Sequence, residues 1–163
     1  MTSASPIPIG SSKKSTRSPI RLLANGPTRT GDHGLIDTSV AIALGVTVAL
    51  HEVPREPSIS ALTLAELMMG LAAASSEPVL IRREGHLHWI EEVVNLLAFD
   101  TGCARAYRCI STATAGVGRK VRGNRAVDLM IAATALAYEL PLYTRNVADL
   151  RGLEDLIEIV DLS

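Results

Sequence analysis

From residue 35 onward, short runs of apolar and β-branched residues alternate with longer segments that have the spacing of amphipathic helices. This alternation is typical of a parallel sheet whose strands are joined by crossover helices, so it predicts an α/β fold. The expected strands are the short runs at 35–37, 58–60, 98–100, 142–144 and 157–160. The expected helices lie at 39–52, 64–74, 79–97, 103–115 and 127–139.

The first 34 residues differ in composition from the rest of the chain. They are rich in Ser, Pro, Gly and Thr, and they carry five basic residues against a single acid. The chain has 163 residues, a length typical of one domain. The sequence therefore predicts a disordered basic tail over 1–34 and one domain over 35–163. An organellar transit peptide and a start codon assigned too far upstream remain alternative interpretations of the tail.

Two features favour a soluble protein in the cytoplasm. The longest uncharged apolar stretch, residues 40–50, is much shorter than the roughly 20 residues that a membrane-spanning helix needs. Cys103 and Cys109 do not form a CxxC motif, so they indicate neither a zinc knuckle nor a disulfide framework. We therefore expect no membrane partner and a reducing environment.

Four acidic residues stand where the strands of such a sheet end or the next helices begin. Asp37 ends the first strand, Glu66 follows the second, Asp128 interrupts an apolar helix, and Asp149 follows the fourth strand. An open α/β sheet binds its ligands beyond the carboxyl ends of its strands. We therefore expect these four side chains to converge on one crevice.

Each acid also has a structural interpretation. Asp37 and Asp149 have the positions of helix or turn caps, and Glu66 ends a capping-box pattern that begins at Thr63. Asp128 has Arg125 one turn earlier as a partner for an ion pair.

Convergence of the acids has an electrostatic cost. Two carboxylates about 4 Å apart repel by roughly 4 kcal/mol at an effective dielectric constant near 20. A bound divalent cation relieves that repulsion most simply. Because all the candidate ligands are oxygens, the ion is expected to be Mg²⁺ or Mn²⁺ rather than Zn²⁺.

A basic segment precedes Asp128. Residues 101–127 contain six basic residues and no acid. Within this segment, Arg122 and Arg125 are candidates for contacts with nucleic-acid phosphates beside the acidic crevice. A solvated charged loop is the alternative interpretation.

Four segments together resemble the PIN-domain ribonucleases, and within them the VapC toxins of toxin–antitoxin pairs. The segments, each built around one of the acids, are residues 35–40, 59–67, 128–135 and 144–150. The resemblance implies a PIN-like fold, with a short parallel sheet between helices, and a metal-dependent endoribonuclease. It implies that the four acids form the catalytic metal site. Asp37 and Asp128 would be the main ligands of Mg²⁺ or Mn²⁺, and Glu66 and Asp149 would complete the inner or second shell of the ion and position water.

The resemblance also implies polar support and partners. Thr38 and Thr144 would support the acids, and Ser39 and Asn146 would help to bind the substrate. The expected partners are an RNA substrate, a VapB-type antitoxin and a second copy of the chain. A non-catalytic PIN-like RNA-binding or scaffold protein remains the main alternative, although such a protein would be expected to lack one of the acids. A phosphoacceptor domain fits less well, because Lys120 is the only lysine after the tail and lies in the basic segment.

Overall fold

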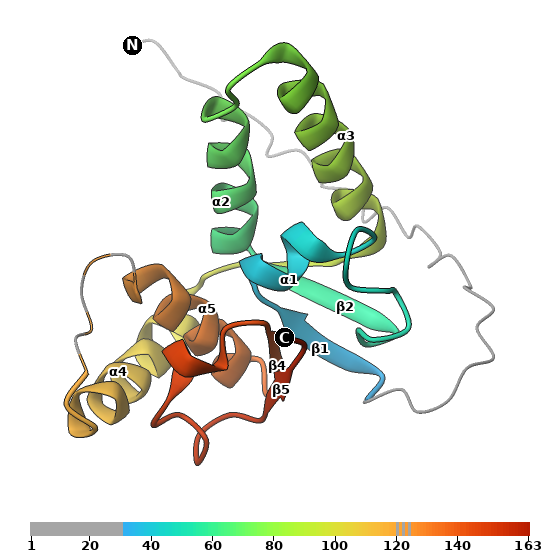
Figure 1. Ribbon diagram of the computed structural model, residues 1–163. Coiled ribbons are helices and arrows are strands. Elements are labelled where there is room, and N and C mark those ends of the chain that lie inside the picture. The colour runs from blue at the N-terminus through green and yellow to red at the C-terminus, as the bar shows by residue number, and fades with distance from the viewer. Residues whose placement is uncertain (1–30, 120, 122, 124) are drawn as a thin grey trace, which may run out of the picture.

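A five-stranded parallel sheet lies at the centre of the described residues, which are 31–119, 121, 123 and 125–163 of a computed structural model (Figure 1). The strand order is β3-β2-β1-β4-β5, and each neighbouring pair is parallel. The strands are β1 (His33–Ile36), β2 (Glu56–Ser60), β3 (Asn95–Leu97), β4 (Leu142–Thr144) and β5 (Ile159–Asp161). The predicted α/β class is confirmed.

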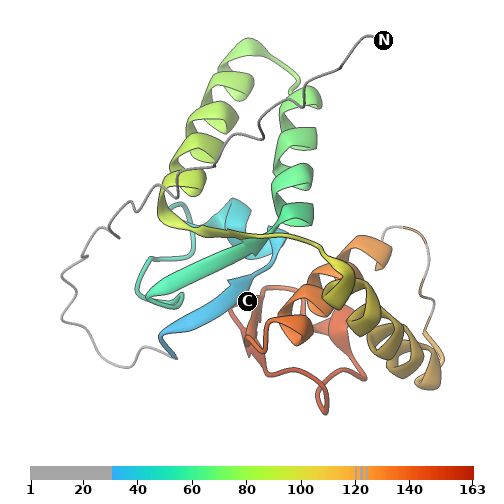
Figure 2. The same ribbon diagram turned by 180° about the vertical axis from the view of Figure 1, so that it is seen from behind.

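Helices connect the strands and cover the sheet in two groups. They are α1 (Thr38–Ala43), α2 (Ala61–Ala72), α3 (Glu77–Val93), α4 (Thr101–Gly116) and α5 (Arg125–Ala137), followed by the short 3-10 helix η1 (Val147–Leu150). Figures 1 and 2 show α2 and α3 as a hairpin that projects from the sheet, while α4 and α5 lie side by side away from that hairpin.

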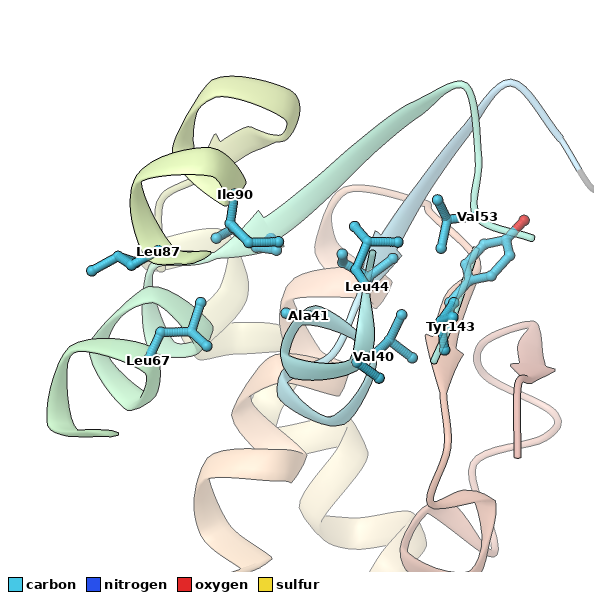
Figure 3. Close-up of a cluster of buried hydrophobic side chains, with 12 residues drawn as sticks. Val40, Ala41, Leu44, Val53, Leu67, Leu87, Ile90 and Tyr143 are labelled. Carbon is cyan, nitrogen blue, oxygen red and sulfur yellow. The ribbon is translucent and has the colours of Figure 1, made fainter. Parts of the chain in front are cut away.

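The core is divided between the two faces of the sheet. Successive strand residues point to opposite faces, and the neighbours Leu35 and Ile36 accordingly belong to different clusters of buried side chains. Ile36 packs in the cluster formed with α1, α2 and α3, which also contains Val40, Ile90 and Tyr143 (Figure 3). Leu35 packs in the cluster formed with α4 and α5. Strand β1 is thus anchored on both faces directly before Asp37.

The strand order places a topological switch point at the end of β1. From β1 the chain continues to β2 and β3 on one side of the sheet, and it later returns to place β4 and β5 on the other side. In open α/β sheets, ligands bind in the crevice outside the carboxyl ends of the strands at such a point. The residues that follow β1 and β4 therefore face the position where a binding site is expected.

Two elements differ from the sequence-based prediction. The third strand was expected at 98–100 but lies at Asn95–Leu97. Asp100 instead caps α4, with its side chain accepting a hydrogen bond from the backbone N–H of Cys103 at 3.0 Å. Residues 93–99 include only one polar side chain, so hydrophobic periodicity did not locate the change from helix to strand.

The first helix is also shorter than predicted. It was expected to reach residue 52 but ends at Ala43, because the backbone of Leu44 is extended and Gly45 adopts a left-handed conformation with φ of 75°. The other helices begin and end within about four residues of the expected positions. Of the predicted tail, residues 1–30 lie outside the described residues. No helix in the described part of the chain has the length and apolar character needed to cross a membrane.

Gly34 provides a test of how tightly β1 is packed. A Cβ atom at this position would lie 2.5 Å from Cε2 of Tyr143 and 2.7 Å from Cγ of Pro54, both too close. We expect Gly34→Ala to lower the free energy of unfolding by about 1–3 kcal/mol, the usual cost of overpacking. Urea denaturation measures this change.

Gly85→Ala is the matched control. Gly85 lies in α3, and a Cβ there would meet no atom of the described residues within 4 Å. Alanine in a helix interior is favoured over glycine by about 0.5–1 kcal/mol, so this variant should be slightly more stable than the wild type. Equal stability of Gly34→Ala and the wild type would contradict the packing described here.

Candidate active site at the carboxyl ends of β1 and β4

Asp37 caps α1 and also faces the crevice. Its Oδ1 atom accepts hydrogen bonds from the backbone N–H of Val40 at 2.9 Å and from the hydroxyl of Ser39 at 2.7 Å. Its Oδ2 atom accepts a hydrogen bond from the hydroxyl of Thr144 at the end of β4. The capping interpretation is thus correct, and the same contacts hold the carboxylate in one orientation.

The turn after β4 orients the two hydroxyls that contact Asp37. The backbone N–H of Asn146 donates to Oγ1 of Thr144 at 2.9 Å, and the backbone N–H of Arg145 donates to Oγ of Ser39 at 3.0 Å. Each hydroxyl therefore accepts from the backbone and donates to the carboxylate. This polar network joins the carboxyl ends of β1 and β4.

Glu66 lies in the second turn of α2, so the predicted capping box is wrong. The helix begins at Ala61, and its cap is Ser60, whose hydroxyl accepts a hydrogen bond from the N–H of Leu62 at 3.2 Å. The Glu66 carboxylate instead accepts a hydrogen bond from the hydroxyl of Thr38 at the start of α1. This contact ties α2 to the segment that carries Asp37.

Asp128 is half-buried in the first turn of α5, and its pKa is raised from 3.8 to about 6. Burial is the largest cause, and the negative charges of Glu66, Asp149 and Asp37 raise the pKa further. The positive charge of Arg125 acts in the opposite direction. The predicted convergence therefore acts on Asp128, because the charges of the other three acids all oppose its ionisation.

Asp149 lies in η1 and has basic partners. Its Oδ1 atom is 3.1 Å from Nη2 of Arg125 and 3.5 Å from Nη2 of Arg119. Its Oδ2 atom accepts a hydrogen bond from the side-chain amide of Asn146. The ion pair expected between Arg125 and Asp128 is thus replaced by one between Arg125 and Asp149. The partnership of Arg119 was not predicted.

Three of the four acids line one cavity of about 60 Å³ at the ends of β1 and β4. The acids are Asp37, Asp128 and Asp149, and the remaining polar lining comes from residues that include Ser39 and Asn146. Glu66 does not line the cavity, although its charge acts on Asp128. Arg122, the other predicted substrate contact, lies outside the described residues.

The donor set fits a hard cation that keeps part of its water shell. Within the described ranges, no group of three Asp, Glu, His or Cys side chains is arranged to hold a metal ion directly. Mg²⁺ typically binds through one or two carboxylates and retains several waters. A cavity of about 60 Å³ exceeds the roughly 10–15 Å³ that one water molecule requires. Carboxylates around a hydrated space are therefore compatible with Mg²⁺ or Mn²⁺.

The sequence of the chain matches the PIN domain over residues 35–151. The chain belongs to the PIN-domain family. This PIN domain is 34% identical over 115 residues to the protein named Ribonuclease VapC5 from Mycobacterium tuberculosis (strain ATCC 25618 / H37Rv). The matched region covers 69% of the present chain and 82% of that relative.

Solved structures share the fold of this PIN domain. A member of the VapBC family of toxin–antitoxin systems, VapBC-5 from Mycobacterium tuberculosis, matches with a TM-score of 0.65 and 28% identity. The match covers 80% of the present chain and 99% of the other. VapBC2 from Rickettsia felis, bound to a DNA fragment from its promoter, matches with a TM-score of 0.64, 18% identity and the same coverage. The expected PIN-like architecture is confirmed.

The raised pKa of Asp128 predicts a pH-dependent stability. Because the folded protein binds this proton more tightly than the unfolded chain, the metal-free protein loses stability as the pH rises from about 4 to about 6. Above about pH 6, the folded protein carries the full free-energy cost of keeping Asp128 ionised. Asp128→Asn removes it, so in EDTA at pH 8 we expect the variant to be more stable by on the order of 1 kcal/mol, after allowance for solvent screening of a half-exposed group.

Urea denaturation at pH 4 and pH 8 measures this effect. At pH 4 the Asp128 side chain is protonated in the folded protein, so the advantage of the asparagine variant should disappear. A stability difference that is the same at both pH values would contradict the electrostatic coupling among the acids.

Proposed function

We propose that this PIN domain is a metal-dependent endoribonuclease that hydrolyses RNA phosphodiester bonds. The observation that carries the proposal is the joint placement of Asp37, Asp128 and Asp149 around one cavity at the topological switch point. The similarity to a protein named Ribonuclease VapC5 supports RNA as the substrate class.

Asp37 and Asp128 are the proposed direct ligands of Mg²⁺, with Mn²⁺ as the alternative ion. When bound, the ion would supply Lewis-acid chemistry, lowering the pKa of a water and polarising the phosphoryl oxygen. Asp37 suits this role because Ser39 and Thr144 fix the orientation of its carboxylate. Asp128 suits it because its neighbours disfavour its ionisation until a compensating positive charge is present.

The remaining residues position these two ligands and the substrate. Glu66, oriented by Thr38, adds negative charge to the site. Ser39 and Asn146 line the cavity and are proposed contacts for the phosphodiester. Arg125 at the start of α5 is a proposed RNA contact. Arg122 has the same proposed role on the basis of the sequence alone.

We further propose that the protein is the toxin of a VapBC-type pair. The related structure VapBC-5 is described as a member of the VapBC family of toxin–antitoxin systems. A VapB-type antitoxin is therefore the proposed protein partner, and a homodimer in the cytoplasm is the proposed state. A basic tail remains part of the same proposal, although His33 and Gly34, which were predicted to end it, belong to β1.

Cleavage of RNA by the purified full chain tests the proposed activity. Labelled single-stranded and structured RNAs are incubated with the protein in Mg²⁺ or Mn²⁺. We expect cleavage that EDTA abolishes and that Asp128→Asn reduces to the level of the EDTA sample, because the variant lacks a ligand charge. Product formation is followed on denaturing gels.

Asp155→Asn is the matched control, since Asp155 is exposed and does not line the cavity. It should cleave RNA at the wild-type rate. Because a contaminating nuclease would cleave in every preparation, loss of cleavage in Asp128→Asn alone also argues against contamination. Undiminished cleavage by Asp128→Asn would contradict the proposed site. Binding of RNA without cleavage in either metal would favour the non-catalytic alternative.

A further inference from the structure

Asp149 differs from the other three acids in its partners. In the part of the chain that the structure describes, Asp37, Glu66 and Asp128 form no ion pair with a basic side chain, whereas Asp149 forms two. The two arginines come from separate segments, because Arg119 follows α4 and Arg125 is the first residue of α5. Asp149 therefore joins both segments to η1.

Both oxygens of Asp149 are already engaged. Oδ1 contacts Arg119 at 3.5 Å and Arg125 at 3.1 Å, and Oδ2 accepts from the amide of Asn146. One carboxylate and two guanidinium groups carry a net charge of about +1. This cluster therefore presents positive charge at the edge of an otherwise acidic cavity. Asp149 paired in this way attracts a divalent cation less strongly than an unpaired carboxylate would.

The arginines are held in place and are only partly covered. The side chains of Arg119 and Arg125 are 23% and 26% exposed. Arg119 also donates a hydrogen bond to the backbone carbonyl of Ala148, and Nε of Arg125 is buried without a hydrogen-bond partner among the described residues. Guanidinium groups bind phosphate through paired, charge-assisted hydrogen bonds. Side chains that are ordered before binding lose less conformational entropy when a ligand arrives.

We propose that Asp149 is the anchor of a phosphate-binding arginine pair, Arg119 and Arg125, and is not a direct metal ligand. The pair binds the RNA backbone beside the cavity, while Asp37 and Asp128 hold the ion. This inference rests on the proposed ribonuclease function, because it assigns the phosphate contact of that same site. It separates the acids into ion-binding and arginine-anchoring groups.

Manganese binding to the intact protein tests the assignment of Asp149. Isothermal titration calorimetry with Mn²⁺, in the absence of RNA, is compared for the wild type, Asp149→Asn and Asp128→Asn. We expect the affinity of Asp149→Asn to stay within threefold of the wild type, and that of Asp128→Asn to fall at least tenfold. A loss in Asp149→Asn equal to that in Asp128→Asn would overturn the assignment.

RNA binding tests the arginine pair without requiring cleavage. Fluorescence anisotropy of a labelled single-stranded oligoribonucleotide in EDTA is measured over a range of salt concentrations. Loss of one phosphate contact on a single strand reduces the slope of log K against log salt concentration by about 0.7. We expect this reduction in Arg119→Gln, with an unchanged affinity for Mn²⁺. An unchanged slope would overturn the role of Arg119 in phosphate binding.

Two further variants separate phosphate binding from a purely structural role. Arg119→Lys keeps the charge and should restore the slope, whereas loss of the ion pair alone would alter thermal stability without altering the slope. Arg82→Gln, at an exposed position on α3, removes a charge away from the site and should leave the slope unchanged. If the slope fell equally in Arg82→Gln, the change would reflect the net charge of the protein and not a phosphate contact of Arg119. That result would overturn the proposal.

These binding measurements remain informative if the proposed function fails. A wild-type protein that binds RNA and Mn²⁺ but does not cleave RNA would refute the nuclease activity, while a reduced salt slope in Arg119→Gln would still support the arginine pair. A protein that cleaves RNA while Asp149→Asn loses Mn²⁺ as Asp128→Asn does would support the nuclease and refute the anchor.

Discussion

Electrostatic repulsion among acids at one end of the sheet is the constraint to which the rest of the site responds. Asp128 is half-buried, and its pKa is raised to about 6 by burial and by the charges of Glu66, Asp149 and Asp37. The fold relieves this repulsion in two ways. Hydroxyl and backbone donors stabilise Asp37, and two arginines neutralise Asp149. Asp128 retains no such partner in the described residues, and a divalent cation would supply one.

The parallel sheet determines where that repulsion is concentrated. Leu35 and Ile36 anchor β1 in the clusters on its two faces, and Asp37 follows at the switch point between β1 and β4. The end of β4 then brings Thr144 to Asp37, although the two residues are 107 positions apart in the sequence. The packed core thus fixes the positions of short polar side chains such as Thr144 and Asp37 around the charged cavity. A hydrolytic site requires functional groups that are held in place in this way.

Local patterns predicted the positions of the acids, whereas the pairing of charges depends on the fold. The strand at 142–144 and the capping role of Asp37 follow from neighbouring residues, and both are confirmed. The third strand was misplaced because an almost uniformly apolar run does not show where a helix ends. The contact between Arg119 and Asp149 joins residues that are 30 positions apart, and no local pattern encodes it. The sequence signal available for Arg119 was the absence of acids in its segment.

Anomalous scattering from a crystal soaked in Mn²⁺ would test the central claim most directly, because it locates the ion without reference to activity. The account predicts a peak in the cavity at the ends of β1 and β4, within ligand distance of Asp37 and Asp128, with Asp149 still paired with its arginines. A peak coordinated by Asp149 after release of Arg119 and Arg125 would contradict the division of roles among the acids. Absence of any peak in the cavity at saturating Mn²⁺ would contradict the metal site itself.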